Sequence, residues 1–115
     1  MAGPSRVVPE DPIGFIRDRV HAGQVLWTYH VMMRVRGRSI SRESILGLSA
    51  SYSLVESYPD DKYLPSYLVL AQEGDEAFHV LFAADVLGQN VRVVTAYRPS
   101  LDEWESDLRT RRRTP

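Results

Sequence analysis

The sequence predicts an α+β fold, in which N-terminal helices pack on a four-stranded antiparallel sheet and a C-terminal helix follows the sheet. Apolar residues recur at helical spacing in the first half of the chain, whereas the second half holds four runs rich in Val, Leu, Tyr and Phe. Short links between the last three runs favour an antiparallel meander. Helices grouped before and after a run of strands are typical of α+β domains with the helices on one face of the sheet.

The length of 115 residues and a hydrophobic content of 43% fit one compact domain. We expect a flexible lead-in over residues 1–10, a single domain over 11–112 and a basic tail over 113–115. No apolar run approaches the ~18 residues of a membrane span and the start lacks a signal-peptide core, so we expect a cytoplasmic protein with no membrane partner. The absence of cysteine excludes disulfides and thiolate metal sites.

Three helix starts are marked in the first half of the chain. Asp11 with Pro12 begins a helix that runs to about residue 22, with Gly23 as its stop. The run 25–29 is extended or a strand, and Thr28 caps a second helix that ends at residue 37. Ser41 caps a third, because the flanking residues 40 and 45 are both isoleucines and match a hydrophobic staple.

The strands are expected at 53–58, 66–72, 77–84 and 91–98. Pro99 ends the last strand because proline cannot donate to a ladder. Ser100 and Glu103 then match a capping box, and Trp104 belongs to the apolar stripe of the helix that this box predicts.

The alternation of the third and fourth strands predicts which side chains are open to solvent. Phe78 and its neighbours at 80 and 82 form the apolar phase, which places His79 on the other face of the sheet. Arg92 and Arg98 form the charged phase of the last strand. If that phase also points away from the helices, the three side chains create a cationic open face.

Several motifs in a fixed order carry a resemblance to a known family: T-Y-H-V-M-M-R-V-R-G-R-S-I, E-S-Y-P-D-D, S-Y-L-V-L, A-F-H-V and V-V-T-A-Y-R-P-S-L-D-E-W. Over about residues 20–112 the chain resembles the bacterial domain-of-unknown-function family 4258, which is distantly similar to BrnT, RelE and ParE toxins. The resemblance implies a RelE/BrnT-like fold and descent from RNA-cleaving toxins whose site lies on the open side of the sheet. Relatives of the ParE type poison DNA gyrase instead.

The resemblance also singles out residues by position. These are His30 and Arg34 in the second helix, Arg36 before its terminal glycine, and His79, Tyr97 and Trp104 in the second half. RelE-type ribonucleases are commonly strongly basic, whereas this chain has a formal net charge of −1.

His30 and Arg34 are four residues apart on one helix face, which suits a general acid/base beside a phosphate ligand. RNA cleavage without a metal or other cofactor needs an acid/base pair, for which His30 and His79 are the candidates, and cations for the phosphorane charge, for which Arg34 and Arg98 are candidates. The alternatives are that His30 orients its helix and that Arg34 pairs with an acid of the 60–61 turn.

The other candidates also have two interpretations. His79 is either an exposed strand histidine or a catalytic or RNA-contacting group. Tyr97 either acts as an acid or stacks on a base, or it is a core tyrosine, since it shares its phase with residues 91 and 93. Arg36 and Arg92 are candidate substrate ligands, and the arginines of 109–113 form either a phosphate-binding patch or a docking surface for an acidic protein. No spacing of the three histidines supports a metal site.

Two functions follow. The first is a metal-independent ribonuclease of a toxin–antitoxin pair, with RNA as substrate and a cognate DNA-binding antitoxin as partner. The second is a noncatalytic protein-interaction domain on the same scaffold. An unpaired sheet edge would in either case allow a homodimer.

Overall fold

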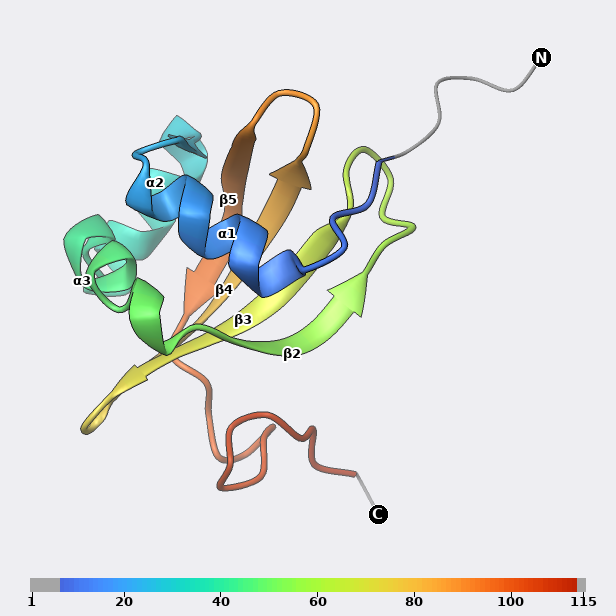
Figure 1. Ribbon diagram of the computed structural model, residues 1–115. Coiled ribbons are helices and arrows are strands. Elements are labelled where there is room, and N and C mark those ends of the chain that lie inside the picture. The colour runs from blue at the N-terminus through green and yellow to red at the C-terminus, as the bar shows by residue number, and fades with distance from the viewer. Residues whose placement is uncertain (1–6, 114–115) are drawn as a thin grey trace.

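The computed structural model describes residues 7–113, within which it has three helices, one 3-10 turn and a five-stranded mixed sheet (Figure 1). The α+β class is confirmed. Residues 1–6 of the predicted lead-in and residues 114–115 of the predicted tail lie outside the described range. In chain order the elements are α1 (Pro12–His21), β1 (Val25–Trp27), α2 (Tyr29–Gly37), α3 (Arg42–Gly47), η1 (Ser49–Ser51), β2 (Ser53–Tyr58), β3 (Ser66–Glu73), β4 (Glu76–Asp85) and β5 (Asn90–Tyr97).

The three helices begin where the capping residues predict. The side chain of Asp11 accepts a hydrogen bond from the Gly14 amide at 3.1 Å, and the Thr28 hydroxyl accepts one from Val31 at 3.1 Å. The Ser41 hydroxyl does the same for α3. Each cap satisfies one of the amide donors left free in the first helical turn. None of the described helices is long and apolar enough to cross a membrane.

The sheet has the order β1-β5-β4-β3-β2. The four predicted strands form an antiparallel meander, but the prediction of four strands is wrong because β1 adds a fifth, parallel to β5. Val25 lies opposite Val91 and Trp27 opposite Val93. A run of three residues carries too little periodicity to be assigned from sequence, and its pairing with a strand near the other end of the chain is invisible there.

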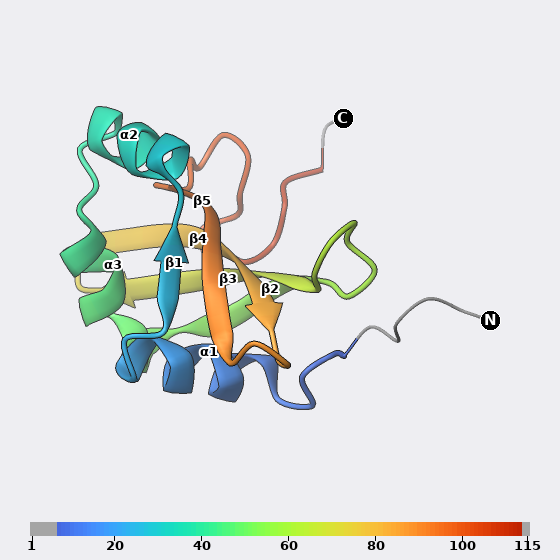
Figure 2. The same ribbon diagram turned by 90° about the horizontal axis from the view of Figure 1, so that it is seen from above.

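One face of the sheet forms the main core. Ile16 of α1, Val35 of α2 and Ile45 of α3 are buried there with the alternate residues of the strands, such as Val80 and Val91. Figures 1 and 2 show α1 lying along this face, whereas the chain after β5 runs on the other side of the sheet. We call that other side the open face.

The predicted C-terminal helix is wrong. Residues 99–113, here called the C-terminal segment, contain turns and one isolated bridge between Trp104 and Arg111 instead. The Ser100 hydroxyl accepts from the amide of Asp102 rather than that of Glu103, so no capping box forms. Leu108 has a φ of 60°, outside the helical region, and reverses the chain.

Two ion pairs stabilise the observed course of this segment, one to the sheet and one within the segment. Arg111 binds Glu56 of β2 at 2.7 Å, and Arg112 binds Glu105 at 3.0 Å. Trp104 is 2% exposed and lies on the open face. Burial of this large side chain outweighs the weak helical preference of a polar segment.

A bulge in β5 changes the phase of its last residues. Leu81 pairs with Thr95 and Phe82 with Val93, so Val94 is the extra residue. Val93 and Ala96 both face the main core as a result, and Tyr97 points to the open face. The interpretation of Tyr97 as sharing a face with residues 91 and 93 is therefore wrong.

Candidate functional site

His79 is fully buried on the open face under the C-terminal segment. Its Nε2 lies 2.7 Å from the carbonyl oxygen of Leu108, and its Nδ1 lies 3.1 Å from the Tyr97 hydroxyl. The Trp104 ring packs edge-on against it, with 4.4 Å between ring centroids. The interpretation as an exposed strand histidine is wrong, because the chain after β5 returns to cover it.

These partners fix the protonation of His79. A carbonyl oxygen can only accept, so Nε2 carries the proton and Nδ1 accepts from Tyr97. Burial lowers the pKa of His79 and outweighs the opposing effect of the hydrogen bond to Leu108. Burial also raises the pKa of Tyr97. The histidine is thus a neutral group with both nitrogens occupied, which suits it to hold the C-terminal segment rather than to contact RNA.

A second polar group on the open face joins β2 to the C-terminal segment. Arg111 donates two hydrogen bonds to the Glu56 carboxylate, at 2.7 and 3.1 Å, and the Tyr58 hydroxyl donates to the same carboxylate. The guanidinium lies over the Trp104 ring at 4.6 Å. Arg111 lowers the pKa of Glu56, and burial followed by the bond to Glu56 raises that of Tyr58. Arg111, Glu56 and Tyr58 therefore bind one another and hold the C-terminal segment against β2.

Arg98 does not share the face of His79. After the bulge it lies on the helix side, where it donates to the carbonyl oxygens of Arg38 at 2.8 Å and Ser39 at 3.1 Å. Its guanidinium also lies 5.2 Å from the Phe78 ring centroid. The prediction of a cationic face made by residues 79, 92 and 98 is therefore wrong. Arg98 instead caps the C-terminal end of α2 through its carbonyl groups.

His30 and Arg34 lie one turn apart on the exposed side of α2. Within residues 7–113 neither side chain makes a hydrogen bond or ion pair, so the alternative pairing of Arg34 with the 60–61 turn is not formed. No contact joins His30 to the buried His79. The side of α2 that carries Arg38 and the buried Val31 faces β5, because Arg38 donates to the carbonyl oxygen of Ala96 at 2.7 Å. The exposed strip with His30 and Arg34 lies next to that side of the helix.

An open groove of about 380 Å³ lies beside that strip, between the start of α2, β5 and the loop before β3. We call it the α2–β5 groove. Its polar and charged rim includes Arg92, whose side chain is half exposed and pairs with Asp85 at 3.2 Å. The lining residues are Thr28, Val31, Asp61, Tyr63, Leu64, Ser66, Ala83, Arg92, Val93 and Val94.

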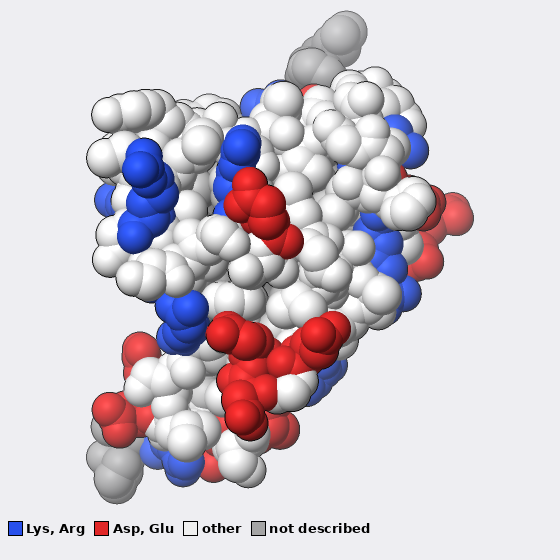
Figure 3. Space-filling view, turned by 90° about the vertical axis from the view of Figure 1, so that its left-hand side faces the viewer, with Lys and Arg blue, Asp and Glu red and all other residues white. Residues whose placement is uncertain are grey.

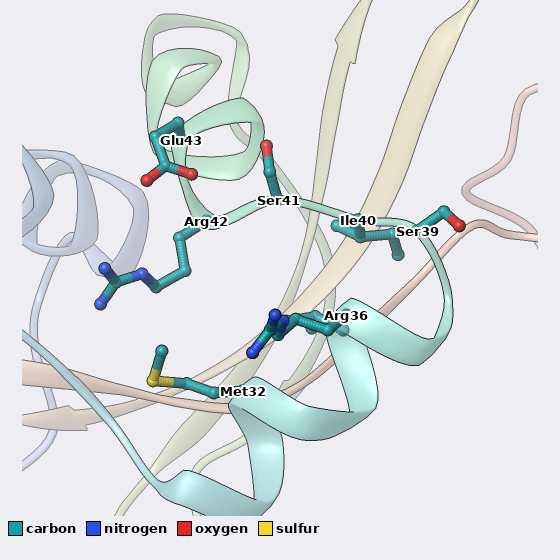
Figure 4. A pocket seen from close by; sticks show the side chains of 8 residues that line it. Met32, Arg36, Ser39, Ile40, Ser41, Arg42 and Glu43 are labelled. Atoms are coloured by element: carbon teal, nitrogen blue, oxygen red, sulfur yellow. The ribbon is translucent and has the colours of Figure 1, made fainter.

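Arg36 belongs to a different groove, of about 510 Å³, between α2 and α3. Figure 4 shows Met32 and Arg36 extending from α2 toward Arg42 at the start of α3. Arg42 also lies over the Trp27 ring at 5.9 Å. Because residues 34 and 36 lie on opposite flanks of one helix, the structure separates the candidate ligands Arg34 and Arg36.

Charges of both signs are mixed on the side of the molecule that carries α2 and α3. Figure 3 shows separate basic side chains across this side, with acidic side chains among and below them. The residues 7–113 contain no group of three or more His, Cys, Asp or Glu placed to hold a metal ion. Any phosphate ligand here would thus be a single arginine rather than a broad basic surface.

Of the predicted site residues, His30 and Arg34 are exposed on α2, Arg92 lines the α2–β5 groove, and His79, Tyr97 and Arg98 have structural partners. The sequence analysis missed Tyr63, which is 81% exposed beside the groove, and Glu56, which anchors Arg111. The exposure of Tyr63 could have been predicted from its place in a turn-rich loop, directly after Lys62 and two residues before Pro65. No local signal points to Glu56, because its partner is far along the chain.

The family model described as Domain of unknown function (DUF4258) matches residues 27–98. This range begins in β1 and ends just after β5, so it contains α2, the whole sheet except two residues of β1, and both grooves. The C-terminal segment lies outside it. No curated protein and no solved structure matches the chain.

Proposed function

We propose that this chain, which belongs to the family described as Domain of unknown function (DUF4258), is a toxin-like, metal-independent ribonuclease of a toxin–antitoxin pair. The observation that carries the proposal is the placement of His30 and Arg34. They are exposed, one helical turn apart, and free of protein partners within the described chain, on the strip of α2 beside the α2–β5 groove. An accessible imidazole next to an accessible guanidinium supplies a proton acceptor and a phosphate ligand.

The chemistry needs these two groups, the RNA itself and water. Neutral His30 takes the proton of a ribose 2′-hydroxyl, and the 2′-oxygen attacks the adjacent phosphorus. The bond from phosphorus to the 5′-oxygen breaks, and that oxygen takes a proton from a water molecule, whose hydroxide takes back the proton held by His30. Arg34 stabilises the charge that develops on the phosphorane oxygens. The products are a 2′,3′-cyclic phosphate and a free 5′-hydroxyl.

This mechanism uses one histidine, whereas the sequence suggests an acid/base pair of His30 and His79. His79 is buried with both ring nitrogens bonded, so it has no proton to exchange with a bound RNA. Its role in the proposal is to hold the C-terminal segment. An antitoxin that covers α2 and the groove would block access to both working groups.

The test is cleavage of a single-stranded RNA oligonucleotide by the purified protein in the presence of EDTA. We expect wild type to produce 2′,3′-cyclic phosphate ends and His30→Ala to lower the rate by about 10²-fold or more. His21→Ala is the matched control, because His21 is an exposed histidine at the end of α1. Equal cleavage by all three proteins, or none by folded wild type, would overturn the proposal.

A second assay tests the toxin part. Induced expression of wild type should arrest growth of a bacterial host, and Arg34→Ala should relieve the arrest. Arg36→Ala is the control for charge, since it removes an arginine from the other flank of the same helix. Normal growth with abundant folded wild type would contradict a toxin function.

A noncatalytic protein-interaction domain is the second candidate. Leu26, Tyr29 and Met33 are 50%, 78% and 47% exposed, and they come from β1 and the neighbouring α2. Exposed apolar groups of this kind favour contact with another protein. Salt-insensitive binding to a protein partner, without RNA binding, would favour this function over the first.

A further inference from the structure

We propose that the α2–β5 groove binds one nucleobase of the RNA, with Tyr63 as the stacking platform and Arg92 as the ligand of an adjoining phosphate. The inference rests on the proposed function and deepens it, because it identifies unpaired RNA as the substrate class. Bases can enter such a groove only when they are released from a duplex.

The groove combines an apolar interior with an exposed aromatic ring. Val31, Ala83 and Val93 contribute buried apolar surface, and Tyr63 stands beside them with 81% of its surface exposed. Most tyrosines bury more of the ring, because an exposed ring leaves apolar area in water. Stacking on a base removes that area from water and is sequence-tolerant, since every base has a π face.

The charges around the groove suit a neutral base with a phosphate at its rim. The carboxylate of Asp61 accepts from its neighbour's amide at 2.9 Å and from the Ser66 hydroxyl at 2.6 Å, so it sits at the wall as an acceptor. A phosphate beside this carboxylate would be repelled. The amino and imino donors of a base edge would instead be attracted to it.

Arg92 lies at the rim with donors to spare. Its Nη2 binds Asp85 at 3.2 Å and its Nε reaches Asn90 at 3.5 Å, but its Nη1 makes no hydrogen bond within residues 7–113. The guanidinium is half exposed and directed by these two partners. It can therefore donate to a phosphate oxygen without leaving Asp85.

The dimensions are consistent with one base. The groove measures about 380 Å³, near the lower end of the ~300–1,000 Å³ of small-molecule sites. The ammonium of Lys62 lies 5.3 Å from the Tyr63 ring centroid. Since Thr28 lines the groove and caps α2, a base bound there lies within one or two helical turns of His30 and Arg34.

The experiment measures binding of a single-stranded 2′-O-methyl RNA oligonucleotide, which cannot be cleaved, at a series of salt concentrations. We expect Tyr63→Ala to weaken binding by about 10-fold with an unchanged salt slope, because stacking releases no counterions. Tyr63→Phe should stay within about 2-fold of wild type, since it keeps the ring. Arg92→Gln should reduce the salt slope by about one phosphate contact.

The control is Tyr29→Ala, which removes an equally exposed tyrosine that does not line the groove. Binding by Tyr63→Ala equal to that of wild type would overturn the base subsite while leaving the ribonuclease proposal intact, provided that wild type still cleaves RNA. If wild type neither binds the oligonucleotide nor cleaves RNA, the subsite and the ribonuclease proposal are overturned together.

Discussion

The hydroxyl of Tyr97 lies 3.1 Å from Nδ1 of His79, and the opposite nitrogen of the same ring lies 2.7 Å from the carbonyl oxygen of Leu108. One imidazole thus connects β5, β4 and the C-terminal segment in a single chain of hydrogen bonds. The His79 ring is completely buried, so these hydrogen bonds take the place of the bonds to water that its nitrogens make in the unfolded chain. The loss of either partner would leave a buried ring nitrogen without a hydrogen bond.

His79→Ala is expected to destabilise the protein by about 2–4 kcal/mol, because it creates a cavity against Trp104 and leaves Tyr97 and Leu108 without partners. Urea unfolding followed by circular dichroism measures the change. His30→Ala is the matched control and should shift the free energy of unfolding by no more than about 0.5 kcal/mol. Similar small effects for both histidines would contradict the assignment of His79.

The stability of the protein should fall as the pH drops below about 6.5. Burial lowers the pKa of His79 in the folded state, so the unfolded state binds the proton more readily. The stability that His79 contributes is therefore fully present above the pKa of the unfolded state and is lost as the pH falls through the folded pKa. Unfolding free energies measured between pH 7.5 and 5 should show this slope, and His79→Phe should flatten it. An equal slope in the variant would exclude His79 as its source.

Trp104→Ala should cost about 3–5 kcal/mol, as expected for removal of a large buried aromatic side chain. It should also release the C-terminal segment, since Trp104 packs against both His79 and Arg111. Limited trypsin digestion can detect the release as faster cleavage after the arginines at 109–113. Leu101→Ala, at a residue 57% exposed in the same segment, should change neither property.

The ion pair of Arg111 with Glu56 should contribute only about 0.5–1 kcal/mol, because the arginine side chain is 57% exposed. A double-mutant cycle with Arg111→Ala and Glu56→Ala measures the coupling. The pKa of Glu56 is lowered in the folded state, so the coupling should be present above pH 4.5 and disappear as the pH falls below it. A coupling that persists at low pH would exclude an electrostatic origin.

Thr28→Ala should destabilise α2 by about 1 kcal/mol, because the Val31 amide loses its capping acceptor. Thr28→Ser keeps the hydroxyl and should retain most of the stability. Urea unfolding of the two variants separates the cap from the lost methyl group. If the two are equally destabilised, the cap is not the reason.

Local signals predicted the elements that depend on neighbours in the chain. The caps at Asp11, Thr28 and Ser41 were identified because each acts within three residues, and β2 matches its expected bounds. Tertiary contacts decided the features that were missed. The extra residue at Val94 inverts the phase of the strand end, and nothing in the sequence marks it.

The residues of the candidate site also fall into those that local sequence signals predict and those that tertiary contacts decide. Exposure of His30 and Arg34 follows from the period of a single helix, so the sequence could identify it. The burial of His79 could not be foreseen, since it depends on the C-terminal segment, for which the capping-box pattern predicted a helix. Trp104 was correctly expected to be buried, although it covers the open face from a loop rather than from a helix.

The parallel pairing of β1 with β5 determines when this domain can complete its fold during synthesis. Val25 has no strand partner until Val91 has left the ribosome, and the Ala96 carbonyl that receives Arg38 emerges later still. Helix α2 therefore gains its final position only when nearly the whole domain has been translated. A nascent chain that stops before β5 carries His30 and Arg34 but lacks Arg92 and the other β5 residues that line the groove, so the site of the proposed ribonuclease function is completed only late in translation.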